Sequence, residues 1–470
     1  MSGARWTAVL VLMLAAAGCR SSSQLQESYA SMNRYGSADQ EAVVGEVSNL
    51  PYKHQKWSHR FADWPIRRLS MGRENLFIET PDNKVACINR FDGITKWVFE
   101  IPTRSPLDWT PIEPGEVYMQ IRDYTQQLAA QTRVVEDILK TEGMGQKAQD
   151  AQRDKNRIYQ LLNASMRGDN VYLVSRQMLY SVARQTGKLL WQRQLPFAPS
   201  AKGFATRESL YMPAGDRPQV WRLDVERRGE AIQSFPADVG AGDRTIMNVP
   251  IFDSDVNHLY FACADGRCYA YNVNTGVKEW TYPAHAKLAA DPLLHTVREK
   301  YKDSSGRETF RTRRYLFIGG LDYALYCLDP DTGTLSWKFE TGGFLRSPTV
   351  VKDQTVYAKS DEGALFALEL DPVHRNPKTN AVEGTKRGGQ MRWKLPAGER
   401  FIVKGSSGDR VLVLGPNSEL YLIAEMTGEI VGRYPLSEIT HVLTNPHDSI
   451  LYVATDSGAV FALEESGSSY

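Results

Sequence analysis

The cysteines are the residues whose type and spacing first suggest chemistry. Cys263 and Cys268 flank a hairpin turn, so they either form a disulfide in an oxidising compartment or remain two unpaired core thiols. Cys87 and Cys327 each lie six residues before a turn glycine, and this shared phase predicts buried free thiols. Adjacent cysteines and a Cys-x-x-Cys-His haem motif are both absent from the sequence. The cysteines downstream of the amino terminus therefore indicate packing rather than catalysis.

The sequence contains no established motif for catalysis or metal binding. Its eight histidines form no His-Glu-x-x-His pair, and neither a Gly-x-Ser-x-Gly elbow nor a P-loop occurs. The acidic turn Asp329-Pro330-Asp331-Thr332-Gly333 suggests calcium at first sight. Turn chemistry explains it without a metal, because proline fixes φ, aspartate bonds nearby backbone amides and glycine takes the left-handed position. We therefore predict no catalytic residue, no metal site and no cofactor.

The remaining cysteine, Cys19, follows an apolar run near the amino terminus. This run is too short to cross a bilayer but suits a secretion signal. The sequence Ala16-Ala17-Gly18-Cys19 resembles a bacterial lipobox, which implies a lipoprotein signal peptide over 1–18 and lipid attachment at Cys19. The alternative is an ordinary secretion signal in which the cysteine is incidental. Residues 19–50 are polar and lack periodicity, which predicts a flexible tether.

Composition narrows the class of protein that these residues belong to. The 470 residues are 42% hydrophobic and 24% charged, which is close to the globular average and argues against disorder or a polytopic membrane protein. The chain has 56 basic and 55 acidic residues, so its net charge is close to zero. Such a chain has no global field for nucleic acid, and we expect none as a partner.

A repeat of a glycine four residues before a tryptophan organises most of the chain. Five copies are complete, and two weaker copies keep the glycine but carry Gln233 or Gly432 in place of tryptophan. Alternating strands precede each copy, with turn signals between them. A four-stranded unit repeated every 40–50 residues or so is typical of a propeller blade. The complete copies end at Trp97, Trp191, Trp280, Trp337 and Trp393.

The two ends of the repeat region predict how the ring closes. The last unit stops at Gly467 without a tryptophan strand, whereas Trp57 lies 40 residues before Trp97 with no turn glycine before it. A strand around Trp57 would complete the last blade, which leaves no blade unfinished. We therefore predict an all-β, eight-bladed β-propeller over 51–470, closed by an N-terminal strand. All six tryptophans are interpreted as structural anchors between blades, without a ligand.

Residues 116–166 depart from the strand pattern. Apolar residues at helical spacing on both sides of Gly143-Met144-Gly145 predict a helical hairpin that projects from the loop between the first two blades. Seven basic and seven acidic residues balance within it, so it is not a polybasic membrane arm. Its apolar stripe is either used up by packing within the hairpin or shared with a partner.

The units Asn272–Trp280 and Asp329–Trp337 follow the pattern [Asp/Asn]-x-x-Thr-Gly-x-x-x-Trp, which resembles the pyrroloquinoline-quinone-type propeller repeat. That family has a branch of quinoprotein dehydrogenases and a branch of BamB-like outer-membrane assembly lipoproteins. The dehydrogenase branch implies a carboxylate-rich calcium site that holds the quinone, and nothing in this sequence marks one. The leader, the tether and the eight repeats favour the BamB-like branch, although the helical insert departs from its compact pattern.

The resemblance implies a non-catalytic, lipid-anchored scaffold that binds an envelope protein partner through propeller loops in outer-membrane protein assembly. We expect a monomeric propeller in the bacterial envelope, held on the outer membrane and facing the periplasm, with membrane lipid contacted through Cys19. The alternatives are a pyrroloquinoline-quinone-dependent dehydrogenase and a ligand-sensing or adhesion propeller. No motif identifies partner-binding residues, so the binding face stays open.

Overall fold

The computed structural model describes residues 50–464, apart from short gaps. The predicted signal peptide, the lipid attachment at Cys19, nearly all of the tether and Gly467 lie outside the described residues. The gaps are residues 53, 62–64, 73, 142–144, 167–168, 216–217, 238–247, 303–307, 371–372, 376–381, 386–387, 397–401, 405–408 and 446–448.

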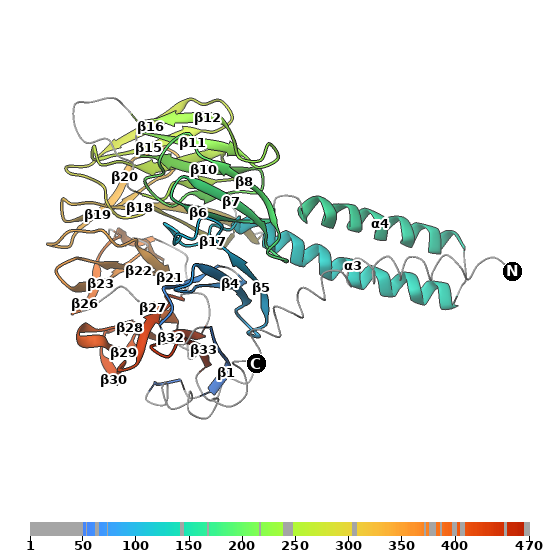
Figure 1. Ribbon diagram of the computed structural model, residues 1–470. Helices are drawn as coiled ribbons and strands as arrows, with labels where there is room; N and C mark the ends of the chain where they lie inside the picture. Colours follow the sequence, from blue (N-terminus) through green and yellow to red (C-terminus); the bar gives the residue numbers. More distant parts are fainter. Residues whose placement is uncertain are drawn as a thin grey trace.

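The described chain is an eight-bladed β-propeller, as the repeat predicts, and each blade is an antiparallel sheet (Figure 1). In chain order, the first four blades contain β2 (Arg68–Met71), β3 (Asn75–Glu79), β4 (Lys84–Asn89) and β5 (Thr95–Glu100); β6 (Asn170–Ser175), β7 (Met178–Ala183) and β8 (Leu189–Gln194); β9 (Phe204–Ala205), β10 (Ser209–Ala214), β11 (Gln219–Asp224) and β12 (Glu230–Pro236); β13 (Ile251–Asp253), β14 (His258–Ala262), β15 (Arg267–Asn272) and β16 (Lys278–Pro283).

The second half of the ring repeats this order with one short inserted ribbon, β24 (Val373–Arg375) and β25 (Val382–Thr385), in blade 6. Blades 5 to 8 contain β17 (Leu293–Lys302), β18 (Glu308–Gly319), β19 (Ala324–Leu328) and β20 (Leu335–Glu340); β21 (Val350–Lys352), β22 (Thr355–Lys359), β23 (Ala364–Glu369) and β26 (Met391–Pro396); β27 (Ile402–Lys404), β28 (Arg410–Leu414), β29 (Glu419–Ala424) and β30 (Ile430–Pro435); β31 (Ile439–Val442), β32 (Leu451–Thr455), β33 (Ala459–Glu464) and β1 (His54–Arg60).

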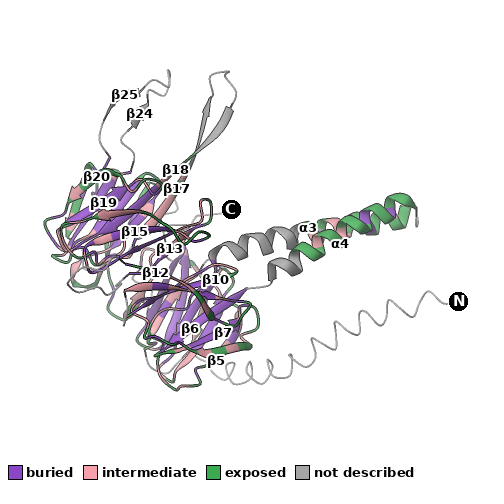
Figure 2. Ribbon diagram, turned by 90° about the horizontal axis from the view of Figure 1, so that it is seen from above, coloured by how far each residue is buried: buried purple, intermediate pink, exposed green. Residues whose placement is uncertain are grey.

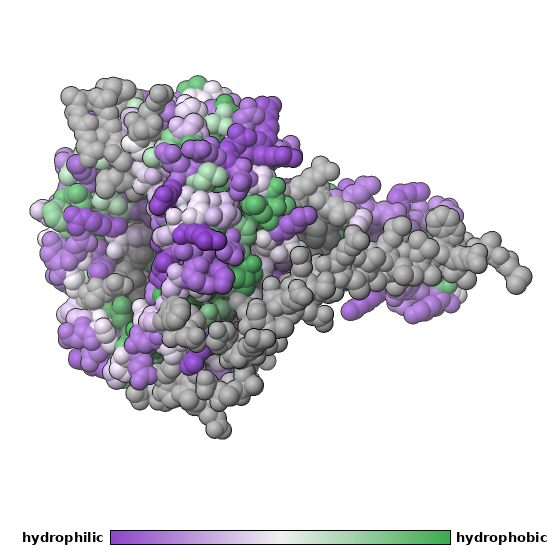
Figure 3. Space-filling view, in the orientation of Figure 1, coloured by the Kyte–Doolittle hydropathy of each residue, from purple (hydrophilic) through white to green (hydrophobic). Residues whose placement is uncertain are grey.

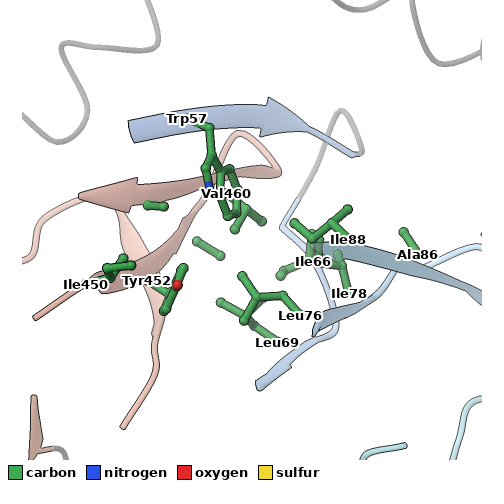
Figure 4. Packing of buried hydrophobic residues seen from close by; sticks show 12 residues of the cluster. Trp57, Ile66, Leu69, Leu76, Ile78, Ala86, Ile88, Ile450, Tyr452 and Val460 are labelled. Carbon is green, nitrogen blue, oxygen red and sulfur yellow. The ribbon is translucent and has the colours of Figure 1, made fainter. Parts of the chain in front are cut away.

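The ring closes as predicted, because β1 pairs antiparallel with β33 and completes blade 8. Trp57 lies opposite Ala462 in this pairing. Its indole is buried and points from β1 toward Val460, in a cluster that also contains Leu76 and Ile88 of blade 1 (Figure 4). The N-terminal strand therefore joins the last blade to the first through apolar burial as well as strand pairing.

The six tryptophans share one packing arrangement at the interfaces between blades. Trp97 of blade 1 illustrates it: the indole lies over the turn of blade 2, and Nε1 donates to the carbonyl of Arg184 at 2.7 Å. A Cβ added at Gly187 would lie 2.6 Å from Cγ of Trp97, and the φ of this glycine is +66°. Only glycine satisfies both conditions, which explains why the sequence repeats glycine and tryptophan together.

The residue opposite each tryptophan on the third strand of the same blade is small. The pairs are Trp57 with Ala462, Trp97 with Cys87, Trp191 with Ser181, Trp280 with Ala270, Trp337 with Cys327 and Trp393 with Ala367. An indole needs this space because it packs flat against its own sheet as well as against the next blade. The shared phase of Cys87 and Cys327 follows directly, and both are buried free thiols as predicted.

The disulfide between Cys263 and Cys268 is not formed, so the alternative of two unpaired core thiols applies. The strand register pairs Cys268 with Ala262, one residue before Cys263. Because neighbouring residues of a strand point to opposite faces, the two sulfurs lie in different apolar clusters. Burial raises the pKa of both thiols far above the usual range, which keeps them protonated.

Two α-helices occur among the described residues, α3 (Gly115–Thr141) and α4 (Gln146–Met166), and they form the predicted hairpin. They project well away from the ring (Figure 1). Their point of insertion differs from the prediction, because Ile112 already bridges to Tyr172 in β6. The hairpin therefore lies inside blade 2, between its first and second strands, rather than between blades 1 and 2.

Candidate functional site

A cavity of about 430 Å³ lies where five successive blades meet. Each blade contributes residues at or just before its first strand, which places the cavity at the centre of the ring. Figure 2 shows the molecule turned by 90° from the view of Figure 1, with the buried residues concentrated in the strands of the blades. Its lining residues are Arg68, Asp108, Trp109, Thr110, Ser200, Ala201, Lys202, Val249 and Asp291. None of these residues was predicted from the sequence.

Lys202 is the most perturbed charged group of the cavity. Its Nζ donates to Oγ1 of Thr110 at 2.7 Å. Burial lowers the pKa of Lys202 from its usual 10.5 to about 8, while the carboxylates of Asp291 and Glu113 oppose that shift. The amine is therefore protonated at neutral pH and titrates in mildly alkaline solution.

Arg68 fixes the segment that carries three further lining residues, Asp108, Trp109 and Thr110. Its Nη2 donates to the carbonyls of Leu107 at 3.4 Å and Asp108 at 3.5 Å. Glu79 is nearly fully buried, and its Oε1 accepts the backbone N–H of Leu107 at 3.0 Å. Burial is the main cause that raises the pKa of the Asp108 carboxyl. This wall of the cavity is therefore held by hydrogen bonds, and it carries both basic and acidic side chains.

Glu113 connects the first strand of blade 2 with blade 1 next to the hairpin. Its Oε1 accepts from Nδ2 of Asn75 at 2.7 Å. A Cβ at Gly72 would lie 1.7 Å from Oε2 of Glu113, so glycine leaves room for this carboxyl group. Burial raises the pKa of Glu113. Because α3 begins two residues later, this contact holds the base of the hairpin against the ring.

The hairpin and the central cavity lie at opposite ends of the first strand of blade 2. Asp108 to Thr110 begin the short strand that reaches Ile112, whereas α3 follows its end. We call the side on which turns join first to second strands the hairpin face, and the opposite side the loop face. The hairpin and the cavity therefore approach the first strand of blade 2 from opposite sides.

The described part of the hairpin packs on itself along one seam. Val135, Ala148 and Ala151 are buried, and Nε2 of Gln131 donates to the carbonyl of Ala151 at 3.2 Å. Larger apolar residues remain exposed elsewhere, including Tyr159 at 54%. The described hairpin surface is otherwise mostly hydrophilic (Figure 3). Self-packing thus accounts for the inner stripe and leaves scattered apolar groups exposed.

The donor set does not fit a calcium-bound quinone. The carboxylates lining the central cavity are Asp108 and Asp291, and both share it with the cations Arg68 and Lys202. No group of three His, Cys, Asp or Glu side chains within the described ranges is arranged to hold a metal ion. In the acidic turn, Oδ1 of Asp329 accepts the N–H groups of Asp331 and Thr332 at 2.9 and 3.1 Å, as turn chemistry predicts.

The cavity residues escaped the sequence analysis because they share no motif. Arg68, Lys202 and Asp291 come from three blades, and only closure of the ring brings them together.

No helix within the described part of the chain is both long and apolar enough to cross a membrane.

Comparisons with known proteins agree with the propeller fold that the repeat predicts. The family model described as outer membrane protein assembly factor BamB matches residues 264–372. No curated protein sequence matches the chain. Among solved structures, it is similar to BamB from Moraxella catarrhalis, with a TM-score of 0.54 and 13% identity over 87% of this chain and 99% of that chain. It is also similar to the computationally designed Ika8 protein, with a TM-score of 0.47 and 12% identity over 86% of this chain and 97% of that one.

These findings confirm the expected resemblance. The PQQ-like, BamB-like repeat is matched over residues 264–372, and the eight-bladed fold is that of BamB.

Proposed function

Starting from this likeness to BamB-type propellers, we propose that the chain is a non-catalytic, lipid-anchored scaffold of the bacterial envelope. It would be held on the outer membrane through Cys19 and bind a protein partner of the outer-membrane assembly machinery. The observation that carries the proposal is the match of residues 264–372 to the BamB family model within a complete propeller ring. A rigid ring suits this role because it displays loops from many blades on each face.

The chemistry of the central cavity supports the non-catalytic part of the proposal. The cavity pairs its carboxylates with the cations Arg68 and Lys202, whereas a site that holds a quinone through calcium needs several carboxylates. We expect no saturable change in quinone absorbance and no dye-linked alcohol oxidation when the protein is mixed with pyrroloquinoline quinone and calcium. Saturable binding with substrate oxidation would instead establish the dehydrogenase.

Site-specific photocrosslinking in living cells tests the scaffold role and locates the binding face. Tyr159 on the hairpin and Tyr323 on the loop face are 54% and 45% exposed, so a photoreactive phenylalanine at each gives a matched pair. We expect one of the two positions to capture a component of the outer-membrane insertion machinery. Failure of both, with intact protein in the membrane fraction, would favour the ligand-sensing or adhesion propeller.

The anchor is tested separately by Cys19→Ala. We expect this variant to lose labelling by a fatty-acid probe and to leave the membrane fraction. Unchanged labelling would show that Cys19 is incidental to the secretion signal.

A further inference from the structure

The central cavity brings two basic side chains together from different blades. Arg68 lies in β2 of blade 1, and Lys202 lies just before β9 of blade 3. The cavity has a volume of about 430 Å³, which is the size of a small-molecule pocket. Five of its lining residues are partly exposed: Arg68, Trp109, Thr110, Ser200 and Lys202. The cavity is therefore open to a solute, and neighbouring side chains do not seal its polar groups.

The ammonium group of Lys202 has unused capacity for hydrogen bonds. It can donate three, and within the described part of the chain it donates one, to Oγ1 of Thr110 at 2.7 Å. Burial lowers the pKa of this amine, and the attraction of Asp291 and Glu113 only partly opposes the shift. Repulsion by Arg68 acts in the same direction as burial. An anion placed beside Lys202 would therefore find free donors and a positive charge that its surroundings do not fully balance.

Arg68 supplies the second positive charge and is held loosely. Its Nη2 makes the two long bonds to backbone carbonyls described above, and Oε2 of Glu79 lies 3.8 Å from its Nε. The side chain is 31% exposed. A guanidinium group in this state can pair with a carboxylate without losing a strong contact.

The acidic side chains of the cavity limit the charge of such an anion. Asp108 and Asp291 line it together with the two cations, so the formal charges of the lining cancel. Oδ1 of Asp291 accepts the backbone N–H of Val249 at 3.0 Å, which keeps this carboxylate in the wall. A ligand with several negative charges would be repelled by both aspartates, whereas one negative charge can lie beside the cations. Trp109 and Val249 are partly exposed and offer apolar surface to the rest of the ligand.

We propose that the central cavity binds a small carboxylate with a single negative charge. The carboxylate accepts hydrogen bonds from Lys202 with Arg68 close by, and the apolar part of the ligand lies against Trp109. A free carboxylic acid and the carboxyl terminus of a polypeptide share this chemistry. The site goes beyond the scaffold role proposed above, and neither depends on the other.

Fluorine NMR of 4-fluorobenzoate with the purified full-length chain tests the proposal, with uncharged 4-fluorobenzamide as the ligand control. We expect saturable line broadening for the benzoate alone. Lys202→Gln should lower the affinity by about tenfold or more, because the positive charge is lost. The matched control is Lys359→Gln at the end of β22, outside the cavity, which should leave broadening unchanged. Melting temperatures report whether each variant is folded.

A second pair of variants changes the charge of the cavity at constant size. Thr110→Glu supplies a carboxylate from within, next to Nζ of Lys202, and should abolish broadening. Thr110→Gln has the same shape without the charge and should retain it.

The affinity of the wild type should also fall about tenfold between pH 7 and pH 9, because Lys202 has a pKa of about 8 and loses its proton in this range. The other charged groups around it are Arg68, Asp108, Glu113 and Asp291. Lys202→Gln, which keeps all four, controls for their effect on this profile.

Competition experiments distinguish the two sources of a carboxylate. Competition by an acetylated tripeptide with a free carboxyl terminus, but not by its amide, would support the end of a polypeptide. Competition by acetate and benzoate without the peptide would support a small molecule. Four results would each overturn the proposal: no saturable broadening, equal broadening of the benzamide, stronger competition by inorganic phosphate than by acetate, or undiminished binding in the folded Lys202→Gln variant.

Discussion

The interface between blades 1 and 2 and the interface between blades 3 and 4 have the same backbone plan but different contents. Trp97 fills the first, opposite Cys87 and over Gly187. In the second, Gln233 stands opposite Arg222 and leaves Gly276 exposed. The comparison teaches that the indole, the small residue facing it and the glycine turn form one unit. When the indole is absent, the facing residue becomes large.

Blade 7 also lacks the tryptophan, but an apolar residue takes up the space there. Gly432 stands at the tryptophan position, and the facing residue is Leu422. Leu422 packs against the apolar cluster that joins blades 7 and 8. An apolar chain thus replaces the indole there, whereas the polar Arg222 accompanies a cavity.

The largest expected contrast comes from removing the side chain at the tryptophan position. We expect Trp97→Ala to lower the free energy of unfolding by about 3–5 kcal/mol, because it opens a cavity and removes the hydrogen bond to Arg184. Gln233→Ala should cost under about 1 kcal/mol, because that side chain is only half-buried and accepts one long hydrogen bond, from Nη1 of Arg222 at 3.5 Å. Chemical denaturation of both variants measures the difference. Equal losses would break the comparison.

A smaller contrast is expected at the turn glycines. Both Gly187 and Gly276 have positive φ, so alanine strains either turn by about 1–2 kcal/mol. At Gly187 the new Cβ also meets the indole of Trp97, which should bring the total to about 2–4 kcal/mol. Thermal unfolding of the two alanine variants gives the ranking. A greater loss at Gly276 would show that its turn is covered after all.

The central cavity adds a pH-dependent contrast with the apolar blade interfaces. The pKa of Lys202 is about 8 in the folded chain and near 10.5 when exposed, so the unfolded chain binds more protons between these values. The charged amine therefore destabilises the fold fully below about pH 8, and this cost fades as pH rises toward 10.5. Lys202→Gln should be the more stable protein at pH 7, by roughly 1–2 kcal/mol, and lose that advantage near pH 10.

Melting temperatures of the wild type and of Lys202→Gln across this range provide the test. A difference that stays constant with pH would show that the lysine titrates normally. Gln233→Ala, far from any perturbed amine, serves as the control whose effect should not vary with pH.

The smallest effect is expected from replacing 117–167 by a short Gly-rich turn. Ile112 and Tyr172 already pair antiparallel, so a tight turn can join the two strands without the helices. The ion pair of Asp169 with Arg184, at 2.5 Å, remains in the shortened chain. We expect the melting temperature to change by only a few degrees, as measured by circular dichroism. Loss of cooperative melting would show that the ring depends on the hairpin.

The ring itself could be predicted because its signal is local and repeated. Glycine, tryptophan and alternating strands recur in each blade, and the unmatched Trp57 indicated the closing strand. The fate of Cys263 and Cys268 could not be read in the same way, since it depends on a one-residue register. The place of the hairpin depended on a single bridge at Ile112, which has no signature in the sequence.

The central cavity could not be predicted from the sequence for a different reason. Lys202 and Asp291 are ordinary surface residue types until several blades converge around them. The unusual interface between blades 3 and 4 did have a signal in the sequence, because Gln233 replaces tryptophan there. Its meaning requires the register that places Arg222 opposite Gln233.

The pairing of β1 with β33 also constrains how the molecule is made. As the chain is synthesised, the segment around Trp57 is made early and must stay unpaired until nearly everything else has followed. Contacts so distant along the polypeptide form slowly, because a long loop loses entropy on closure. During that interval the free border of β33 offers backbone groups to any extended neighbour. Biogenesis of this protein therefore has a vulnerable period that ends only when β1 pairs with β33.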